Sequence, residues 1–330
     1  MIREIINREF LIKNFPNEND YIKSFFNYQI SKWEFAKNSY KELNNSSLKK
    51  FQFDKTTVFV QYNPGREKST FADTSEEAIK NRKCYLCDEN LFDEQIGLKI
   101  SDKFTLLVNP YPIVKKHFTA KFHIHVPQRI SENFSDFLQV SDFIGENYFL
   151  LFNGPEAGAS VPEHRHFQAG DISELPLVNE IKDFLNHGNS NSIELVENKE
   201  IDGISVLLIS DKLRSFFLLK GRDNQNYISV FYSIYQKLQE QFPSKKETKL
   251  NLLAFKFLGQ TIVLIFPRRK HRPDLFYDTV NPVKISPATI DIAGILVAPR
   301  YKDFEGINKK IIKQIFDETL YNKSDLRNLL

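Results

Sequence analysis

The feature that most constrains the fold is residues 164–168, where the sequence His-Arg-His-Phe-Gln follows directly after a loop of small residues. Side chains of an extended strand alternate between the two faces of a sheet, so both imidazoles and the carboxamide are expected to share one face. The preceding residues 153–160, Asn-Gly-Pro-Glu-Ala-Gly-Ala-Ser, contain two glycines, which let backbone approach a ligand closely because they lack a Cβ. Together the two segments predict a site that handles phosphate groups.

Composition and charge limit the class of protein. The 330 residues are 41% hydrophobic and 26% charged, which is typical of a folded globular chain, and the length favours two domains. The net charge of +3 is too small to indicate binding to nucleic acid but is compatible with a small anionic ligand. Charge interrupts the first residues too soon for a secretory signal, and no apolar run approaches the roughly 20 residues that cross a membrane. With Cys84 and Cys87 as the only cysteines, a disulfide framework is excluded and a cytoplasmic location is expected.

Hydrophobic periodicity predicts an α+β fold built on antiparallel strands. In the first half, helices are expected over residues 21–43 and 135–145, and strands over 51–62, 104–108, 117–126, 148–152 and 164–168. The second half repeats the alternation, with strands near 192–196, 204–209, 215–219, 250–257 and 261–266 and helices over 227–241 and 304–320. A linker is expected within residues 172–190, because Gly188 precedes a run of Asn and Ser.

Cys84 and Cys87 form a Cys-x2-Cys pair, which needs two further ligands to complete a tetrahedral zinc site. His117, His123 and His125 supply candidates. His123 and His125 fall on the same face of a predicted strand, so the spacing alone does not choose between them. A redox-active pair and two ordinary buried thiols are the alternatives to zinc.

Three segments resemble the transferase branch of the histidine triad superfamily, to which galactose-1-phosphate uridylyltransferase and diadenosine tetraphosphate phosphorylase belong. The His-x-His-x-Gln pattern of residues 164–168 is similar to that branch, where glutamine replaces the third histidine of the hydrolases. Residues 58–66, Val-Phe-Val-Gln-Tyr-Asn-Pro-Gly-Arg, look closest to the GDP-sugar phosphorylases. Their C-terminal signature is similar to residues 293–297, Ala-Gly-Ile-Leu-Val, followed by Arg300, Asp303 and Phe304.

The resemblance implies two histidine-triad-like half-domains, each an antiparallel half-barrel sheet packed with helices. Residues 1–175 would form the catalytic half with the zinc site, and residues 176–330 would form a related half that completes the substrate pocket. The resemblance also implies that Cys84, Cys87, His125 and His164 hold a structural zinc ion. Such a closed four-ligand site would hold the active strand in place rather than activate water.

The resemblance further implies roles in catalysis. His166 would attack the α-phosphorus, and a neutral imidazole can do so if its other nitrogen donates to a fixed acceptor, for which a backbone carbonyl is expected. Gln168 would donate an amide N–H to an α-phosphate oxygen and favour transfer to phosphate over hydrolysis. Ser160, Asn153 and the backbone of Gly158 are expected to contact further phosphate oxygens.

Basic residues in two places are candidates for phosphate contacts. Arg66 resembles the arginine with which the family grips the phosphates, and Lys68 is a further candidate. A solvated turn is the alternative for both residues, and it carries more weight for Lys68 than for Arg66. The cluster Arg-Arg-Lys-His-Arg at residues 268–272 either contacts phosphates from the second half or forms a solvated loop.

The function expected from the resemblance is that of a nucleotidyltransferase of the phosphorylase type. It would act on a nucleoside diphosphate sugar, with GDP-hexose preferred, through a nucleotidyl-histidine intermediate and with inorganic phosphate as acceptor. The alternatives are a dinucleoside polyphosphate enzyme such as diadenosine tetraphosphate phosphorylase, a hexose-1-phosphate uridylyltransferase, and a catalytically inactive nucleotide-binding protein. No nucleic-acid or membrane partner is expected. The sequence leaves the oligomeric state open, with a homodimer as one option.

Overall fold

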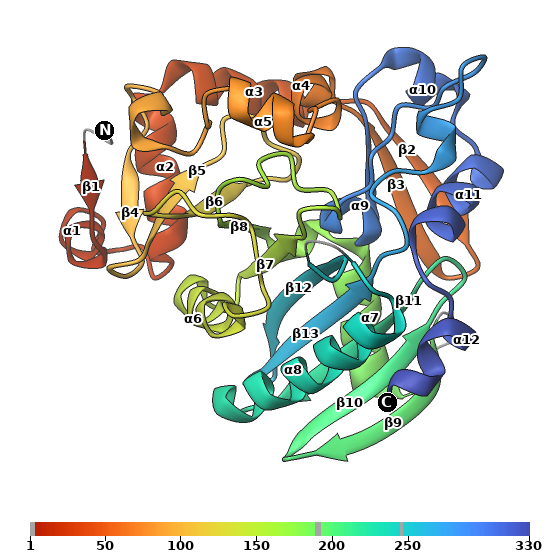
Figure 1. The fold of residues 1–330 in the computed structure, drawn as a ribbon. Helices are drawn as coiled ribbons and strands as arrows, with labels where there is room; N and C mark the ends of the chain where they lie inside the picture. The colour runs from red at the N-terminus through yellow and green to blue at the C-terminus, as the bar shows by residue number, and fades with distance from the viewer. Residues whose placement is uncertain (1–3, 189–192, 245–246) are drawn as a thin grey trace.

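A large sheet runs through the part of the chain that the computed structural model describes, which is residues 4–188, 193–244 and 247–330 (Figure 1). In those residues the sheet has eleven strands in the order β1-β4-β5-β6-β8-β7-β12-β13-β11-β10-β9. The strands on the N-terminal side are β1 (Ile5–Ile6), β4 (Gly97–Lys99), β5 (Phe104–Val108), β6 (Phe118–Phe122), β7 (Tyr148–Asn153) and β8 (His166–Asp171). The others are β9 (Glu194–Ile201), β10 (Ile204–Ser210), β11 (Ser215–Gly221), β12 (Leu250–Phe257) and β13 (Gln260–Pro267). Neighbours pair antiparallel except β1 with β4, so the predicted α+β class is confirmed.

A smaller sheet joins the two ends of the chain. It contains β14 (Ile295–Ala298), β3 (Thr56–Tyr62) and β2 (Leu48–Phe53), with β14 parallel to β3 and β2 antiparallel to it. The two segments that resemble the GDP-sugar phosphorylases therefore lie side by side, although more than two hundred residues separate them in the sequence.

Helices cover both faces of the large sheet (Figure 1). In the first part of the chain they are α1 (Arg8–Asn14), α2 (Tyr21–Lys32), α3 (Glu34–Asn44), α4 (Glu67–Thr70), α5 (Glu76–Asn81) and α6 (Phe134–Ile144). The later helices are α7 (Pro176–His187), α8 (Asn224–Gln241), α9 (Thr289–Ile292), α10 (Tyr301–Gly306), α11 (Lys309–Thr319) and α12 (Lys323–Leu326). Short 3-10 turns are η1 (Pro64–Arg66), η2 (Asp88–Asn90), η3 (Ile172–Glu174), η4 (Asp274–Phe276) and η5 (Arg327–Leu329). None of the helices in the described residues combines the length and apolar composition needed to cross a membrane.

Two apolar clusters divide the core, one on each face of the large sheet. Alternate strand residues such as Phe167 and Ala169 pack against α2, α6 and α8. The residues between them in the sheet face the other way, where the second cluster packs against α7, α11 and the small sheet. His166 and Gln168 alternate with Phe167 along β8, so their side chains lie on this second face.

The order of elements is the same in the two parts of the large sheet. We call β4, β5, β6, α6, β7 and β8 the first half, and β9, β10, β11, α8, β12 and β13 the second half. In both halves, three strands that are consecutive in the sequence lie side by side, a helix follows, and two further strands complete the half. The later of these two strands lies next to the first three, so the order of the pair in the sheet is the reverse of its order in the sequence. The halves meet where β7 pairs with β12. The boundary after residue 175 stays a prediction.

Three predicted elements are interrupted in the structure. The helix expected over residues 21–43 breaks at Trp33, whose backbone is extended and whose side chain is buried. The strand expected over 51–62 is a hairpin, because Asp54 adopts a left-handed φ of 53° that aspartate tolerates in turns. The helix expected over 304–320 ends at Gly306 and restarts after Asn308, whose side chain caps α11.

The expected linker was also partly wrong. Most of residues 172–190 forms η3 and α7, because Pro176 suits the first turn of a helix and the apolar face of α7 packs into the core. The Asn/Ser run of the predicted linker and the start of the strand expected near residue 192 lie outside the described residues.

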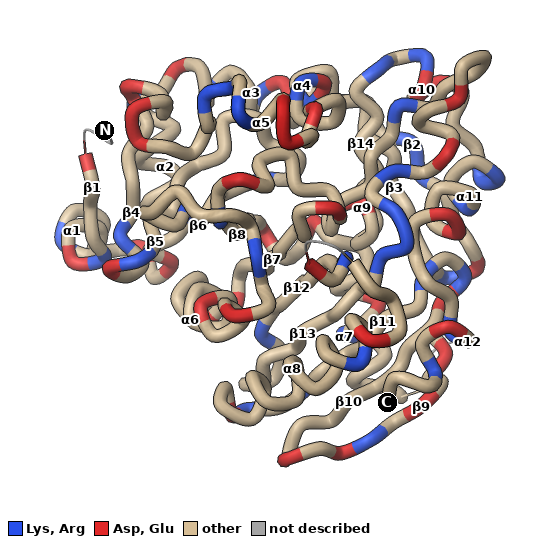
Figure 2. The backbone as a smooth tube through the Cα atoms, in the orientation of Figure 1, with Lys and Arg blue, Asp and Glu red and all other residues tan. Residues whose placement is uncertain are grey.

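Basic and acidic residues are interspersed along both halves (Figure 2).

Candidate active site

His166 opens β8 and is 4% exposed. Its Nδ1 lies 2.8 Å from the backbone oxygen of His164, and a carbonyl only accepts, so Nδ1 carries the proton. Nε2 therefore holds the lone pair. Burial lowers the pKa of His166, with the contact to the His164 carbonyl opposing it, so the ring is neutral near pH 7. The fixed acceptor that a histidine nucleophile requires is present.

The backbone of His166 is held by Gln128, which is fully buried. Oε1 of Gln128 accepts from the His166 N–H at 2.8 Å, and its Nε2 donates to the His166 carbonyl at 2.8 Å. The same Nε2 lies 3.3 Å from the carbonyl of Asn153 on β7. The last paired residues of β7 and β8 are Leu151 and Gln168, so the side chain of Gln128 bridges the two strands where their pairing stops.

Gln168 is oriented by His117, a fully buried residue just before β6. The backbone N–H of Ile113 donates to Nδ1 of His117 at 3.3 Å, so in the neutral ring Nε2 carries the proton. That Nε2 donates to Oε1 of Gln168 at 2.9 Å. Burial and the nearby Arg66 lower the pKa of His117 to about 3, which keeps the ring neutral. The amide N–H groups of Gln168 are thereby left for a ligand in the cavity that Gln168 lines.

Asn153 is oriented in the same way by the second half and by α9. Its Oδ1 accepts from the side chain of Asn251 at 2.9 Å and from the backbone and hydroxyl of Thr289 at 2.9 and 2.7 Å. Asn251 is in turn held through its Oδ1 by the buried Arg268 at 2.7 Å. Because three donors meet the oxygen of Asn153, its NH2 group faces the cavity.

The connection between β7 and β8 brings Gly158 and Ser160 to the same cavity. Gly158 has a φ of +95°, and a Cβ there would lie 2.8 Å from the Cα of Ala288, so this position requires glycine. Ser160 accepts a hydrogen bond at its carbonyl from Arg82 at 2.9 Å, which fixes the loop while its side chain lines the cavity.

Arg66 and Lys68 differ in their position. Arg66 lines the cavity and donates to the Tyr111 carbonyl at 3.0 Å. Burial lowers the pKa of Arg66 to about 10, and the negative charge of Asp291 opposes this shift. Asp291 lies in the cavity wall, and burial raises its pKa to about 6. Lys68 is exposed and outside the cavity lining, with its Nζ 4.8 Å from the centre of the Tyr85 ring.

Cys84, Cys87, His125 and His164 come together in a cluster whose ligand atoms all lie within 4.8 Å of one another. Sγ of Cys84 is 3.4 Å from Nδ1 of His164, and Sγ of Cys87 is 3.1 Å from Nδ1 of His125. Tetrahedral zinc with bonds of about 2.3 Å to sulfur and 2.0–2.1 Å to nitrogen would separate S and N by about 3.6 Å, so the donor set fits. The Nε2 of His164 donates to the Phe122 carbonyl at 2.8 Å, which directs Nδ1 toward the cluster.

His123 takes no part in this cluster. Its Nε2 lies 2.8 Å from the hydroxyl of Thr105. Spacing left open whether His123 or His125 belongs to the metal cluster, and the structure places His125 in it.

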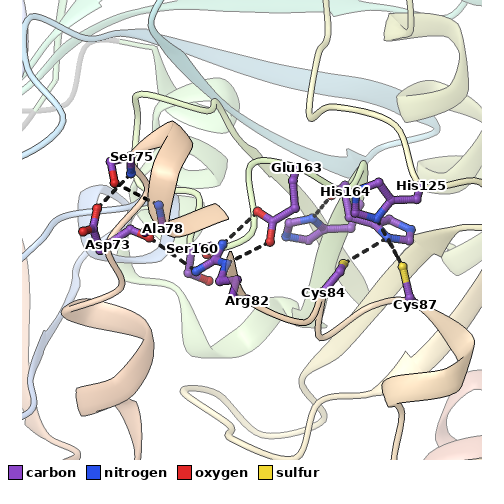
Figure 3. Close-up of polar contacts among 11 residues, drawn as sticks. Asp73, Ser75, Ala78, Arg82, Cys84, Cys87, His125, Ser160, Glu163 and His164 are labelled. Atoms are coloured by element: carbon purple, nitrogen blue, oxygen red, sulfur yellow. Dashed lines mark hydrogen bonds and ion pairs between the residues drawn. The ribbon is translucent and has the colours of Figure 1, made fainter. Parts of the chain in front are cut away.

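Arg82 ties the segment before Cys84 to the loop before His164 (Figure 3). Its guanidinium forms a fork on Glu163 with distances of 3.0 and 2.8 Å, and one of its nitrogens also donates to the Ser160 carbonyl. Both side chains of this ion pair are largely buried. The candidate metal cluster and the loop of the cavity are thus one connected unit.

The basic residues 268–272 have separate roles. Arg268 is buried and holds Asn251, whereas Arg269 and Lys270 make surface ion pairs with Asp325 and Asp274. His271 and Arg272 line the cavity. Neither alternative from the sequence describes the whole cluster, because its members point in different directions from one loop.

Solved structures support the fold, and a family model covers part of the chain. A family model described as a domain of unknown function (DUF4922) matches residues 25–171, which include the four residues of the metal cluster and Gln168. A search of curated proteins finds no match. Among solved structures, yeast Ap4A phosphorylase Apa2 has a TM-score of 0.57 at 14% identity, over 87% of this chain and 96% of that chain.

Two complexes of the same yeast protein give similar values. With AMP the TM-score is 0.54 at 17% identity, over 88% of this chain and 95% of that chain. With Ap4A it is 0.51 at 15% identity, over 87% and 96%. The expected likeness to diadenosine tetraphosphate phosphorylase is therefore confirmed at the level of the fold.

Sequence reasoning missed Gln128, Asn251 and the role of His117. A histidine before a buried strand was visible in the sequence, but its partner Gln168 lies 51 residues away. Gln128 and Asn251 carried no local signal, because a single carboxamide in a loop or strand is common.

Proposed function

We propose that the protein is a nucleotidyltransferase of the phosphorylase type that works through a nucleotidyl-His166 intermediate. The observation that carries the proposal is the neutral imidazole of His166, whose Nδ1–H is held by the His164 carbonyl at 2.8 Å. The fixed carboxamides of Gln168 and Asn153 line the neighbouring cavity.

In the first step, the lone pair of His166 Nε2 attacks the α-phosphorus of a nucleoside diphosphate sugar. The bond from that phosphorus to the bridging oxygen breaks, and sugar 1-phosphate leaves with the bonding electrons. The ring becomes a cation that keeps its Nδ1 proton, and donation to the His164 carbonyl stabilises this charge.

In the second step, an oxygen of inorganic phosphate attacks the same phosphorus from the vacated side. The bond between phosphorus and Nε2 breaks, its electron pair returns to the ring, and a nucleoside diphosphate is released. His166 is neutral again, and no proton has moved within the protein.

Charge on the non-bridging oxygens would be met by groups that are already in place. Gln168 and Asn153 would each offer an N–H, and Arg66 would offer a positive charge. Gln168 carries no titratable proton, which favours an acceptor that brings its own nucleophilic oxygen over water.

Cys84, Cys87, His125 and His164 would hold a structural zinc ion. When bound, it would cross-link two segments that are far apart in sequence and take no part in bond breaking. The backbone oxygen of His164 would then be fixed by its own side chain, and so would the tautomer of His166.

A GDP-hexose is the first choice of donor because the two segments that resemble GDP-sugar phosphorylases lie together beside the cavity. Arg66, the last residue of the first segment, and Val297 from the second both line the cavity. Ap4A is the second candidate, since the yeast phosphorylase of the same fold has been solved with Ap4A and with AMP. The cytoplasmic location and a homodimer stay predictions.

The test is to incubate the protein with GDP-sugars, UDP-sugars and dinucleoside polyphosphates, with and without phosphate, and to identify the products by chromatography. Phosphate-dependent release of GDP from one sugar donor is the expected result. Release of ADP and ATP from Ap4A would move the assignment to the second candidate. Absence of turnover with every donor, together with tight nucleotide binding, would indicate an inactive nucleotide-binding protein.

A further inference from the structure

Two cavities meet beside the candidate active site. The smaller one contains Gln168 and Asn153, and the larger one, of about 600 Å³, lies against it. Thr74, His271 and Arg272 line both cavities. The two cavities therefore share one wall, and the proposed function assigns no role to the residues of this wall.

Among the described residues, one group at this wall and one beside it in the larger cavity make no hydrogen bond or ion pair. Within the described ranges, the ring nitrogens of His271 make no hydrogen bond or ion pair. The same is true of the Nζ of Lys249, which lines the larger cavity. Arg272 is anchored by donation to the carbonyls of Thr70 and Ala72 and to the hydroxyl of Ser286. Its Nη1 makes no such bond in the same part of the chain.

Carboxylates also line the larger cavity, but three of them are already engaged. Glu163 pairs with Arg82, and Glu156 accepts from Ser244. Glu247 accepts from two backbone N–H groups through Oε1, whereas its Oε2 is buried without a hydrogen-bond partner among the described residues. Glu76 interacts with the protein as well. Glu247 does not line the wall that the two cavities share. The unengaged groups of His271 and Arg272 at that wall, and of Lys249 beside it, can act as donors, and an anion would satisfy them.

The ring of His271 is suited to be a neutral donor. Burial lowers its pKa to about 3, and the positive charges of Arg272, Arg268 and Lys249 add to the effect. A neutral imidazole offers one N–H, which complements the two cationic groups beside it.

We propose that His271, Lys249 and Arg272 form a second phosphate-binding site, which holds the phosphate of the leaving product and then the incoming inorganic phosphate. The site rests on the proposed function, in which both groups must occupy the same side of the α-phosphorus. It lies next to Gln168 and Asn153 because His271 and Arg272 line their cavity. The ligand class is a phosphate mono- or dianion, and the second half of the chain supplies all three residues.

The first measurement is equilibrium binding of inorganic phosphate to the protein as purified, by calorimetry. Loss of one charge-assisted or buried hydrogen bond to phosphate corresponds to roughly a 10-fold or greater loss of affinity, which is expected for His271→Ala and Lys249→Met. The matched control is Lys270→Met, on the same loop, because the Nζ of Lys270 pairs with Asp274 at the surface. The control is expected to stay within about twofold of the original protein.

The second measurement follows the intermediate. The donor that labels His166 is used to prepare the nucleotidyl-enzyme, which is then mixed with increasing inorganic phosphate. The half-saturating phosphate concentration should rise roughly 10-fold in the two site variants, while slow hydrolysis by water stays unchanged. His271→Asn is included in case the alanine variant folds poorly.

The outcomes separate the two proposals. Phosphate affinity equal to that of the Lys270→Met control in both His271 and Lys249 variants overturns the second site, whether or not an intermediate forms. Weakened phosphate binding without any adduct on His166 would support the site and reject the proposed function.

Discussion

The first and second halves of the large sheet share their order of strands but differ in the chemistry of one face. In the second half this face is apolar, and it is buried against α7, α11 and the small sheet. Its side chains are Leu207, Ile209, Phe216, Leu218, Leu253, Phe255, Ile262, Leu264 and Phe266. In the first half the same face carries Thr119, Lys121, His166, Gln168 and Asn153, which border the candidate site.

The connections at the equivalent hairpins differ as well. Residues 154–165 join β7 to β8 and supply Gly158, Ser160 and the proposed metal ligand His164. In the second half only Leu258 and Gly259 join β12 to β13, both with left-handed φ, as a tight hairpin turn requires. A short turn leaves no room for a cavity at that end of the sheet.

The shared topology places the strands in the same way in both halves. Whether one face of the sheet becomes a core or a site depends on the alternate residues of its strands and on the long loop between β7 and β8. The second half still contributes at its strand ends, through Asn251, Arg268 and His271.

The largest effect is expected for His166→Gly, because the variant lacks the proposed nucleophile. Turnover should fall by at least about 10³-fold, and the nucleotidyl adduct should disappear from mass spectra of donor-treated protein. His187→Gly, at an exposed position on α7, is the control and should retain normal turnover. Activity that survives in the His166 variant would remove the covalent mechanism.

Next in size is Gln168→Ala, which removes a fixed donor from the polar face. A loss of about 10²–10³-fold in kcat is expected, with little change in the thermal midpoint. His117→Phe should reproduce part of the loss, since Gln168 would keep its amide but lose the donor that orients it. If the His117 variant were fully active, the orientation of Gln168 would have to come from elsewhere.

Metal removal should affect the first half alone. We expect one zinc per chain by elemental analysis, and about 10²-fold lower turnover after chelation because the His164 carbonyl is no longer fixed. A loss of about 4 kcal/mol would lower the thermal midpoint by on the order of 10 °C. Hydrogen exchange should rise in β6 and β8 but not in β10 and β11; metal-free protein with normal activity would contradict the structural role.

The smallest effect is expected for Asn251→Leu in the second half. Asn153 would lose one of three donors to its Oδ1, so kcat should fall by about 10-fold, the usual cost of one buried hydrogen bond. Ile262→Val, on the apolar face, should cost about 1 kcal/mol of stability and leave kcat unchanged. Equal kcat values for the two variants would show that the second half acts only as a scaffold.

The sequence predicted the elements of the fold well where local patterns determine them. Residues 104–108 and 250–257 have the predicted bounds, because continuous apolar runs end at turn residues. The hairpin at Asp54 and the helix break at Trp33 were missed, since each depends on one dihedral angle that tertiary packing selects.

The residues of the candidate site likewise differ in whether the sequence could predict their role. Cys84, Cys87, His125 and His164 were proposed together on the strength of a resemblance, and the structure brings them into one cluster. His117 with Gln168, Gln128 with His166 and Asn251 with Asn153 span 51, 38 and 98 residues. Contacts at such separations follow from strand pairing across the whole sheet, which no local window of sequence contains.

The pairing of β7 with β12 has a consequence for any attempt to divide the chain. All six residues of β7, Tyr-Phe-Leu-Leu-Phe-Asn, are buried, so an N-terminal fragment would expose an apolar strand edge to other molecules. We expect such a fragment to aggregate when expressed alone and to become soluble when its complement is co-expressed. The pairing of β7 with β12 therefore makes the solubility of each half depend on the other.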